Sequence, residues 1–123
     1  MNRISVGTDI IEVERIRKSC ASQHFCKRVF SEQEREMFAQ KKDPWQSMAG
    51  NWAAKEAFAK ALGTGICGFS LNEVSCLRDE NGCPYLKLDG KALDIAKQLG
   101  VSASVSISHT KDYATATVIL FGE

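Results

Sequence analysis

The sequence predicts an α+β fold in which an antiparallel sheet packs against one long central helix. Three observations lead to this expectation: a β-branched run at residues 4–11, a helical pattern of small and apolar residues over about 44–62, and two alternating runs that close the chain. The expected order is β-ααα-ββ-α-ββ. A length of 123 residues with 44% hydrophobic content fits one domain, residues 1–123, with a small core.

The first predicted element is a strand near the N-terminus. Residues 4–11, ISVGTDII, are rich in β-branched side chains, and alternation puts Asp9 on the face of Gly7 and opposite the face of Val6. The strand should end near Asp9. From Glu12 onward the hydrophobic spacing becomes that of a helix, so the first helix should follow the strand directly.

Two further helices are expected before the middle of the chain. The stretch SEQE, which starts at Ser31, has the form of a capping box and predicts a helix start there. Asp43 is a suitable N-cap and Pro44 suits the first helical position, so the long helix should begin there and run to about Leu62. Gly63 can supply the left-handed C-cap.

The second half of the chain is predicted to contain two hairpins around a helix. Residues 73–88 form two strand-like runs joined by an Asn-Gly turn, a strong hairpin signal. Residues 89–100 have the pattern of a short helix that ends at a glycine. Residues 101–109 alternate apolar residues with serines, and 113–121 should return as their antiparallel partner.

Composition excludes several classes of function. Sixteen basic and fifteen acidic side chains give a net charge of +1, which argues against a general nucleic-acid binder. Five cysteines without a C-x-x-C pair indicate neither a disulfide framework nor a zinc site and favour a reducing compartment. There is no signal-peptide pattern and no apolar run of about 20 residues. We therefore expect a cytoplasmic protein with no nucleic-acid or membrane partner.

A carboxylate, Glu56, interrupts the apolar stripe of the long helix, and Lys60 lies beside it. If the first strand packs on this helix, Asp9 and Glu56 meet, and two like charges at close range require a compensating cation. Mg²⁺ is the simplest candidate because it prefers oxygen ligands and retained waters. The alternative is structural: Glu56 pairs with Lys60 one turn later, and Asp9 caps the following helix. The stripe consists of Trp45, Met48, Ala49, Trp52 and Ala53.

Two other places could carry function. His109, Thr110 and Lys111 lie at a predicted strand end, where an imidazole, a hydroxyl and an ammonium could hold phosphate oxygens. A packed or hydrogen-bonded histidine is the alternative for His109.

The segment from Arg15 to Phe30 holds five cations and no acid, with Phe25 among them. Such a segment is a plausible docking surface for an acidic partner. A solvated basic face is the structural alternative.

Four blocks of the sequence, in order, resemble a known family. They are GTDIIEVERI at 7–16, WAAKEAFAKALGTGI at 52–66, NGCPYLKL at 81–88 and SISHTKDYATATVI at 106–119. Together they are similar to the bacterial holo-acyl-carrier-protein synthases, the small class of 4'-phosphopantetheinyl transferases. The resemblance covers nearly the whole chain. It implies Mg²⁺-dependent transfer of phosphopantetheine from coenzyme A to a serine of acyl carrier protein, with release of adenosine 3',5'-bisphosphate.

The resemblance also implies roles for individual residues. Asp9 and Glu56 become the Mg²⁺ ligands. Lys60 lies near the phosphates and is catalytic, and Lys55 and Gly63 shape the coenzyme A pocket.

For the remaining residues the resemblance implies a shared site. His109, also catalytic, and Thr110 reach coenzyme A across the subunit boundary of a homotrimer. Arg15, Phe25 and Arg28 then become the expected contacts of the acidic acyl carrier protein.

The expected chemistry is attack of a serine hydroxyl on the β-phosphorus of the pyrophosphate. The metal and Lys60 would stabilise the charge that develops on its oxygens. A metal-bound water or Glu56 could take the serine proton. The chain departs from the family at Asn51, where relatives often carry arginine, and at Ala59, where they often carry serine. The rival function is a non-catalytic subunit of the same fold that binds coenzyme A or a nucleotide, and a small RNA-binding domain ranks last.

Overall fold

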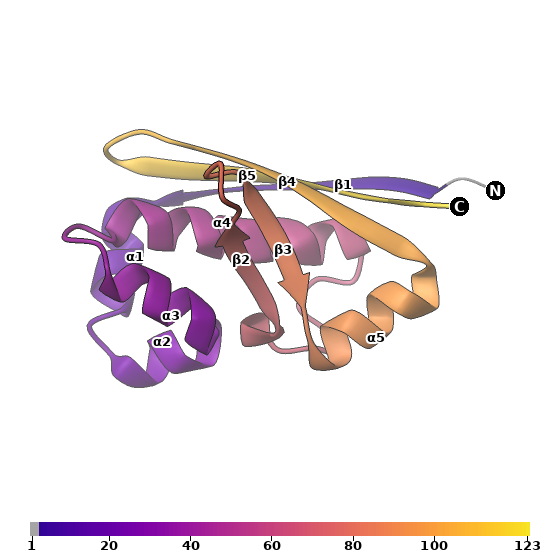
Figure 1. The fold of residues 1–123 in the computed structure, drawn as a ribbon, viewed down its shortest axis with the longest axis horizontal. Helices are drawn as coiled ribbons and strands as arrows, with labels where there is room; N and C mark the ends of the chain where they lie inside the picture. The colour runs from indigo at the N-terminus through magenta and orange to yellow at the C-terminus, as the bar shows by residue number, and fades with distance from the viewer. Residues whose placement is uncertain (1–2) are drawn as a thin grey trace.

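The computed structural model describes residues 3–123 and confirms the predicted α+β class (Figure 1). A three-stranded antiparallel sheet has the strand order β1-β5-β4, and β2 and β3 form a separate hairpin. Within residues 3–123 no helix is long and apolar enough to cross a membrane. The elements in chain order are β1 (Arg3–Glu12), α1 (Val13–Ser19), α2 (Gln23–Val29), α3 (Glu32–Ala39), α4 (Trp45–Leu62), the 3₁₀ helix η1 (Leu71–Glu73), β2 (Val74–Arg78), β3 (Pro84–Leu88), α5 (Gly90–Leu99), β4 (Val101–His109) and β5 (Tyr113–Gly122).

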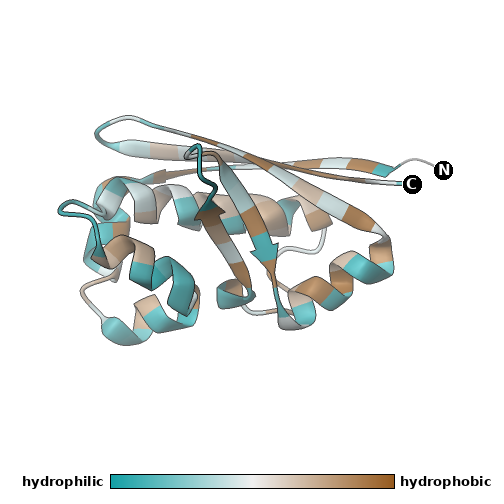
Figure 2. Ribbon diagram, viewed as in Figure 1, coloured by the Kyte–Doolittle hydropathy of each residue, from teal (hydrophilic) through white to brown (hydrophobic). Residues whose placement is uncertain are grey.

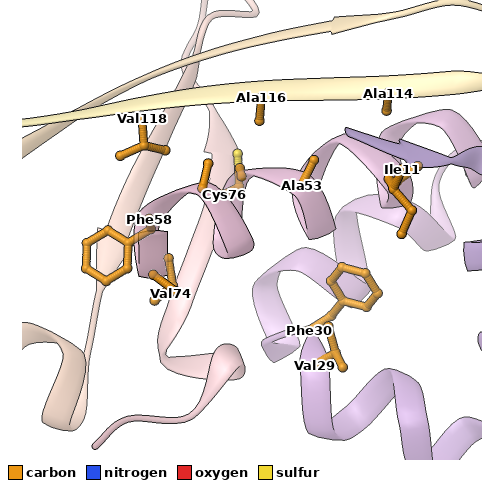
Figure 3. Close-up of a cluster of buried hydrophobic side chains, with 14 of the residues drawn as sticks. Ile11, Val29, Phe30, Ala53, Phe58, Val74, Cys76, Ala114, Ala116 and Val118 are labelled. Carbon is orange, nitrogen blue, oxygen red and sulfur yellow. The ribbon is translucent and has the colours of Figure 1, made fainter. Parts of the chain in front are cut away.

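Helix α4 is the centre of the molecule. The three-stranded sheet lies along one side of it, and α1 to α3, the hairpin and α5 lie on the other side (Figure 1). Small residues let these layers approach closely: Ala53, Ala54 and Ala57 are fully buried. Figure 3 shows Phe58 and Val74 gathered below Val118 of β5. The core is therefore built around the helix that carries Glu56.

Gly7 permits the closest approach between sheet and helix. A Cβ atom at this position would collide with the backbone oxygen of Ala57 and the backbone nitrogen of Ala61. The strand therefore turns its Gly7 face toward α4, and Asp9, two residues further on, shares that face. This contact decides which of the two faces of β1 points inward.

The opposite face of β1 is apolar and uncovered in the single chain. Ile4, Val6 and Ile10 expose 76%, 62% and 63% of their surface. Ile119 and Phe121 of β5 pair with Val6 and Ile4 and are also exposed. Figure 2 shows hydrophobic residues recurring along the strands of this sheet. Because adjacent side chains of this size form a continuous patch, the outer face needs a partner of matching chemistry.

A buried ion pair ties α3, α4 and β2 together. Lys55 and Glu34 have no exposed side-chain surface, and Lys55 Nζ lies 2.5 Å from Glu34 Oε1. Lys55 also donates hydrogen bonds to the carbonyl oxygens of Leu71, at 3.1 Å, and Val74. The second oxygen of Glu34 accepts from Asn51 Nδ2 at 2.9 Å. Both charges are thus saturated by partners, as burial requires.

Three details differ from the sequence-based expectation or refine it. The chain from Glu12 to Ser31 contains two helices where one was predicted, because α1 ends at Cys20 and the Ser22 side chain caps a new helix, α2. Asp43 does not cap α4; Pro44 occupies the N-cap position and offers no side-chain hydrogen bond. The capping box at Ser31 is confirmed, with Glu34 as its partner.

We predict that Lys55→Met strongly destabilises the fold. The substitution leaves the Glu34 carboxylate buried without its countercharge, and loss of one partner of a buried pair costs about 3–5 kcal/mol. Urea unfolding measures the change. Lys60→Met is the matched control, because Lys60 is exposed and its loss should cost less than about 1 kcal/mol. Equal effects of the two substitutions would contradict the structural role of Lys55.

Candidate active site

The structure brings Asp9, Glu56 and Lys60 together at the edge of the sheet where β1 meets α4. Lys60 Nζ lies 3.2 Å from Asp9 Oδ1, although the two residues are 51 positions apart in the sequence. Lys60 also donates a hydrogen bond to the Thr8 carbonyl oxygen at 3.0 Å. The Asp9 side chain is only 17% exposed, whereas that of Lys60 is 55% exposed. The ammonium can therefore leave Asp9 for another anion at little cost.

This geometry rejects the structural alternative for these residues. Among residues 3–123 the ion pair of Lys60 is with Asp9, and none is formed with Glu56. The N-cap position of α1 belongs to Glu12 and receives no side-chain cap, so Asp9 does not cap that helix. Both carboxylates therefore face a common space instead of serving local helix contacts.

Glu56 is held in an environment that opposes its charge. Partial burial raises the pKa of the Glu56 carboxyl, the nearby Asp9 carboxylate raises it further, and Lys60 offsets part of the effect. Lys60, one helical turn after Glu56 on α4, lies 3.2 Å from Asp9, so the two carboxylates lie on the same side of the helix. A cation placed between them would remove the repulsion.

The donor set fits Mg²⁺. Within residues 3–123 no group of three or more His, Cys, Asp or Glu side chains could cage a metal. Two oxygen donors remain, Asp9 and Glu56, and Mg²⁺ is commonly held by one or two carboxylates together with waters and substrate phosphates. A pair of carboxylates that repel each other is suited to such an ion.

The prediction that Lys55 contacts coenzyme A does not agree with the structure. Its side chain is fully buried, and its ammonium is paired with Glu34. Since Lys55 and Glu56 are consecutive residues of a helix, they point about 100° apart. Lys55 therefore belongs to the interior, and Glu56 to the site.

Asn51 and Ala59, the two departures from the family pattern, are also buried. Asn51 donates to Glu34 Oε2 and to the Cys76 carbonyl oxygen, and its own oxygen accepts from Arg78 Nη2 at 3.1 Å. The Asn51 amide is therefore occupied by interior partners and has no part in the candidate site. The roles of Glu34 and Arg78 were not predicted, because charged residues are usually exposed and nothing in the surrounding sequence indicates that these two side chains are buried.

Gly63 ends α4 in the left-handed conformation, with φ of 83°. A Cβ atom there would meet no other atom within 4 Å, so the space beside Gly63 is open. Gly65 also has positive φ, at 67°. This turn follows Lys60 by less than one helical turn, and the space beside Gly63 itself is open.

His109 and Thr110 form a second group of predicted site residues, at the turn between β4 and β5. His109 ends β4 and is exposed, and the two residues line a hollow of about 260 Å³ together with Ile10, Ser108 and other residues of the sheet. Among residues 3–123 no hydrogen bond or ion pair joins His109 to Asp9, Glu56 or Lys60. Within one chain, direct polar contacts therefore do not join the two groups of predicted residues.

The basic segment forms the surface of α1 and α2. Arg17 is engaged by Glu14, with Nη2 and Oε1 2.5 Å apart, while Arg15 and Arg28 form no ion pair among the described residues. Phe25 is half-buried: its ring stacks on Trp52 with centroids 5.8 Å apart, and the Arg28 guanidinium lies over it at 5.9 Å. Phe25 thus supports Arg28 more than it projects as a free apolar anchor.

Comparison with known proteins agrees with this arrangement. The family model of the 4'-phosphopantetheinyl transferase superfamily matches residues 5–118. The holo-(acyl-carrier-protein) synthase of Caldanaerobacter subterraneus subsp. tengcongensis is 48% identical over 121 residues, which cover 97% of this chain and 95% of the relative.

Solved structures give the same result. The holo-(acyl-carrier-protein) synthase of Bacillus anthracis, in complex with CoA (3',5'-ADP), has a TM-score of 0.82 at 34% identity and covers 97% of this chain and 96% of its own. The enzyme of Neisseria meningitidis has a TM-score of 0.87 at 34% identity, with coverage of 94% and 96%.

We predict that Glu56→Gln raises the stability of the metal-free protein at neutral pH. The pKa of Glu56 is higher in the folded than in the unfolded protein, so the folded protein favours the protonated carboxyl. This contribution to folding stability is complete below the unfolded-state pKa and is lost as the pH rises through the folded-state pKa. Because the glutamine amide stays neutral at all these pH values, the variant does not lose this stability as the pH rises. Thermal unfolding in a chelator across the acidic to neutral range should show a gain that shrinks as the pH falls; a gain independent of pH would contradict the assignment.

Proposed function

The chain belongs to the 4'-phosphopantetheinyl transferase superfamily, and we propose that it transfers the phosphopantetheine arm of coenzyme A to a serine hydroxyl of an acyl carrier protein. The reaction would require Mg²⁺ and release adenosine 3',5'-bisphosphate. The observation that carries this proposal is the convergence of Asp9, Glu56 and Lys60 from distant parts of the chain. The five cysteines are free thiols, which fits the reducing cytoplasm in which we place the reaction.

The roles of the residues follow from their charges and positions. Asp9 and Glu56 would hold Mg²⁺, which supplies positive charge to the oxygens of the coenzyme A pyrophosphate. Lys60 is exposed and can exchange Asp9 for a phosphate oxygen, where its ammonium stabilises the charge that develops on the leaving phosphate. The Glu56 carboxylate has no ion-pair partner among the described residues and can accept the serine proton directly or through a water.

The rival function, a non-catalytic subunit that binds coenzyme A, is less consistent with the same geometry. Coenzyme A is anionic, and a site for binding alone gains nothing from two adjacent carboxylates that repel each other and the ligand. The pair has a physical reason only if a cation joins it. Incubation with apo-acyl carrier protein, coenzyme A and Mg²⁺, followed by mass measurement of the carrier, distinguishes the two functions; an unmodified carrier rejects the proposed transfer.

We predict that Asp9→Ala and Glu56→Ala each lower the rate of carrier modification by more than about 100-fold, since even the loss of a residue that supports a metal ligand costs 10–100-fold. Both variants should remain folded, because removal of one carboxylate relieves repulsion. The rate is followed by carrier mass, and circular dichroism checks the fold. Glu36→Ala, a change of an exposed acid on α3, is the matched control. Near-normal Mg²⁺-dependent turnover of either variant would remove that residue from the metal site.

We also propose a homotrimer with active sites between subunits. Two observations support it: the apolar outer face at Val6 and Ile10 is exposed, and among the described residues no hydrogen bond or ion pair joins His109 to Glu56. A neighbouring copy could cover that face and bring His109 and Thr110 to the phosphates of a coenzyme A held beside Lys60.

We predict complementation between two inactive variants if the site is shared. A mixture of Glu56→Ala and His109→Ala chains, unfolded and refolded together, should recover part of the wild-type activity, because some sites then combine an intact Glu56 with an intact His109. Each variant refolded alone is the control. No recovery in a mixture shown to contain mixed oligomers would mean that each site is built from one chain.

The carrier is proposed to dock on the surface of α1 and α2. Arg15 and Arg28 form no ion pair among the described residues, and the Arg28 guanidinium makes a cation–π contact with the Phe25 ring. Acyl carrier proteins are strongly acidic, so complementary charge would favour encounter at this surface.

We predict that Arg15→Glu or Arg28→Glu raises the apparent KM for the carrier and leaves the KM for coenzyme A nearly unchanged. Salt should weaken the wild-type reaction in the same way, since exposed charges are screened beyond about 8 Å at physiological ionic strength. Steady-state kinetics with each substrate varied in turn measures both effects. Lys97→Glu is the control, because it makes the same change of charge on α5, away from the proposed docking surface. An increase in the KM for coenzyme A alone would reject this docking surface.

A further inference from the structure

A cavity of about 380 Å³ lies at the junction of α1, α2 and α3, and neither Asp9, Glu56 nor Lys60 lines it. Its lining includes two cysteines, Cys20 and Cys26, and two cations, Lys27 and Arg35, with Gln23 completing it. None of these side chains has a part in the proposed transfer reaction.

The two cysteines are adjacent in space. Cys20 is the C-cap of α1, and Cys26 lies in the middle of α2 after a short turn. Cys26 Sγ donates to the carbonyl oxygen of Cys20 at 3.7 Å, so the Cys26 sulfur lies over the backbone of Cys20. Both side chains are half-buried, and both line the same opening. Burial raises the pKa of the Cys20 thiol, and hydrogen bonding and charge repulsion from Cys26 raise it further.

The other three cysteines lack such a neighbour. Cys67 and Cys83 are exposed, and Cys76 is buried next to the Arg78 guanidinium. A disulfide requires two Cβ atoms within about 4.5 Å of each other. The turn between α1 and α2 is the place in the described chain where two cysteines line one cavity.

The cavity lining is positively charged. Arg35 is steadied by a hydrogen bond from its Nε to the Phe30 carbonyl oxygen at 3.3 Å, and Lys27 is exposed on α2. No acidic residue lines the cavity. A ligand that carries carboxylates would therefore be favoured over a neutral or cationic one of the same size.

We propose that Cys20 and Cys26 form a dithiol site that reacts with small anionic disulfides and closes to an intrachain disulfide. The thiolate of Cys26 attacks one sulfur of the ligand, forms a mixed disulfide and expels the other half as a thiolate. The Cys20 thiol then loses its proton to solvent, and its sulfur attacks Cys26 Sγ and expels the second half. Two protein thiols and one disulfide give one protein disulfide and two small thiols, and the two electrons pass to the ligand.

The experiment uses glutathione disulfide as the anionic probe. After incubation the remaining thiols are alkylated and the protein is digested with trypsin, which cuts after Lys18 and Lys27 and so releases both cysteines in the peptide 19–27. The expected product is this peptide, unalkylated, lighter by two hydrogens and free of glutathione. In Cys20→Ser the same peptide should retain glutathione on Cys26, and Cys83→Ser, the matched control, should close the ring normally.

The choice of disulfide tests the charge of the cavity. Glutathione disulfide should react several-fold faster than cystamine, which is cationic, and Lys27→Gln should reduce this preference while Lys97→Gln leaves it unchanged. Alkylated Cys20 and Cys26, or glutathione retained on wild-type Cys26, would overturn the dithiol site. Equal rates with the two probes would overturn its anion preference. These readouts need no transfer activity, so they stand or fall independently of the proposed function.

Discussion

The buried ion pair between Glu34 and Lys55 is the constraint on which the rest of the structure depends. It joins α3 to α4, and through Leu71 and Val74 it joins both to the start of the hairpin. A charged pair without water tolerates little movement, because every lost hydrogen bond leaves a buried polar group unsatisfied. The ion pair therefore fixes how α4 is rotated about its own axis and so which residues of α4 face the interior, and it does so from the side of the helix opposite the sheet.

That rotation determines where the chemistry can occur. With Lys55 directed into the interior, the next residue, Glu56, is directed toward the edge of the sheet. On the sheet side, Gly7 brings β1 against Ala57 and places Asp9 beside Glu56. Two structural contacts, one on each side of the helix, thus bring together two carboxylates that repel each other.

The sheet also links the interior site to a surface. Its inner face packs on α4, while its outer face carries exposed apolar side chains along β1 and β5 and ends near His109. Only the inner face of β1 packs within the chain, so the apolar side chains of the outer face stay exposed. The same strand that presents Asp9 to the helix therefore carries an uncovered apolar patch on its other face.

The sequence by itself determined the α+β class, the capping box at Ser31, the hairpins and the candidate pair of Asp9 and Glu56, because these depend on local periodicity and on short motifs. It could not place Lys55 or Asn51, since a lysine in a helical motif looks the same whether it faces solvent or a buried glutamate 21 residues away. It also missed α2, whose start depends on a single serine cap. Only the tertiary structure decided which face of β1 lies inward and that Lys55 pairs with Glu34, because both follow from packing between segments far apart in sequence.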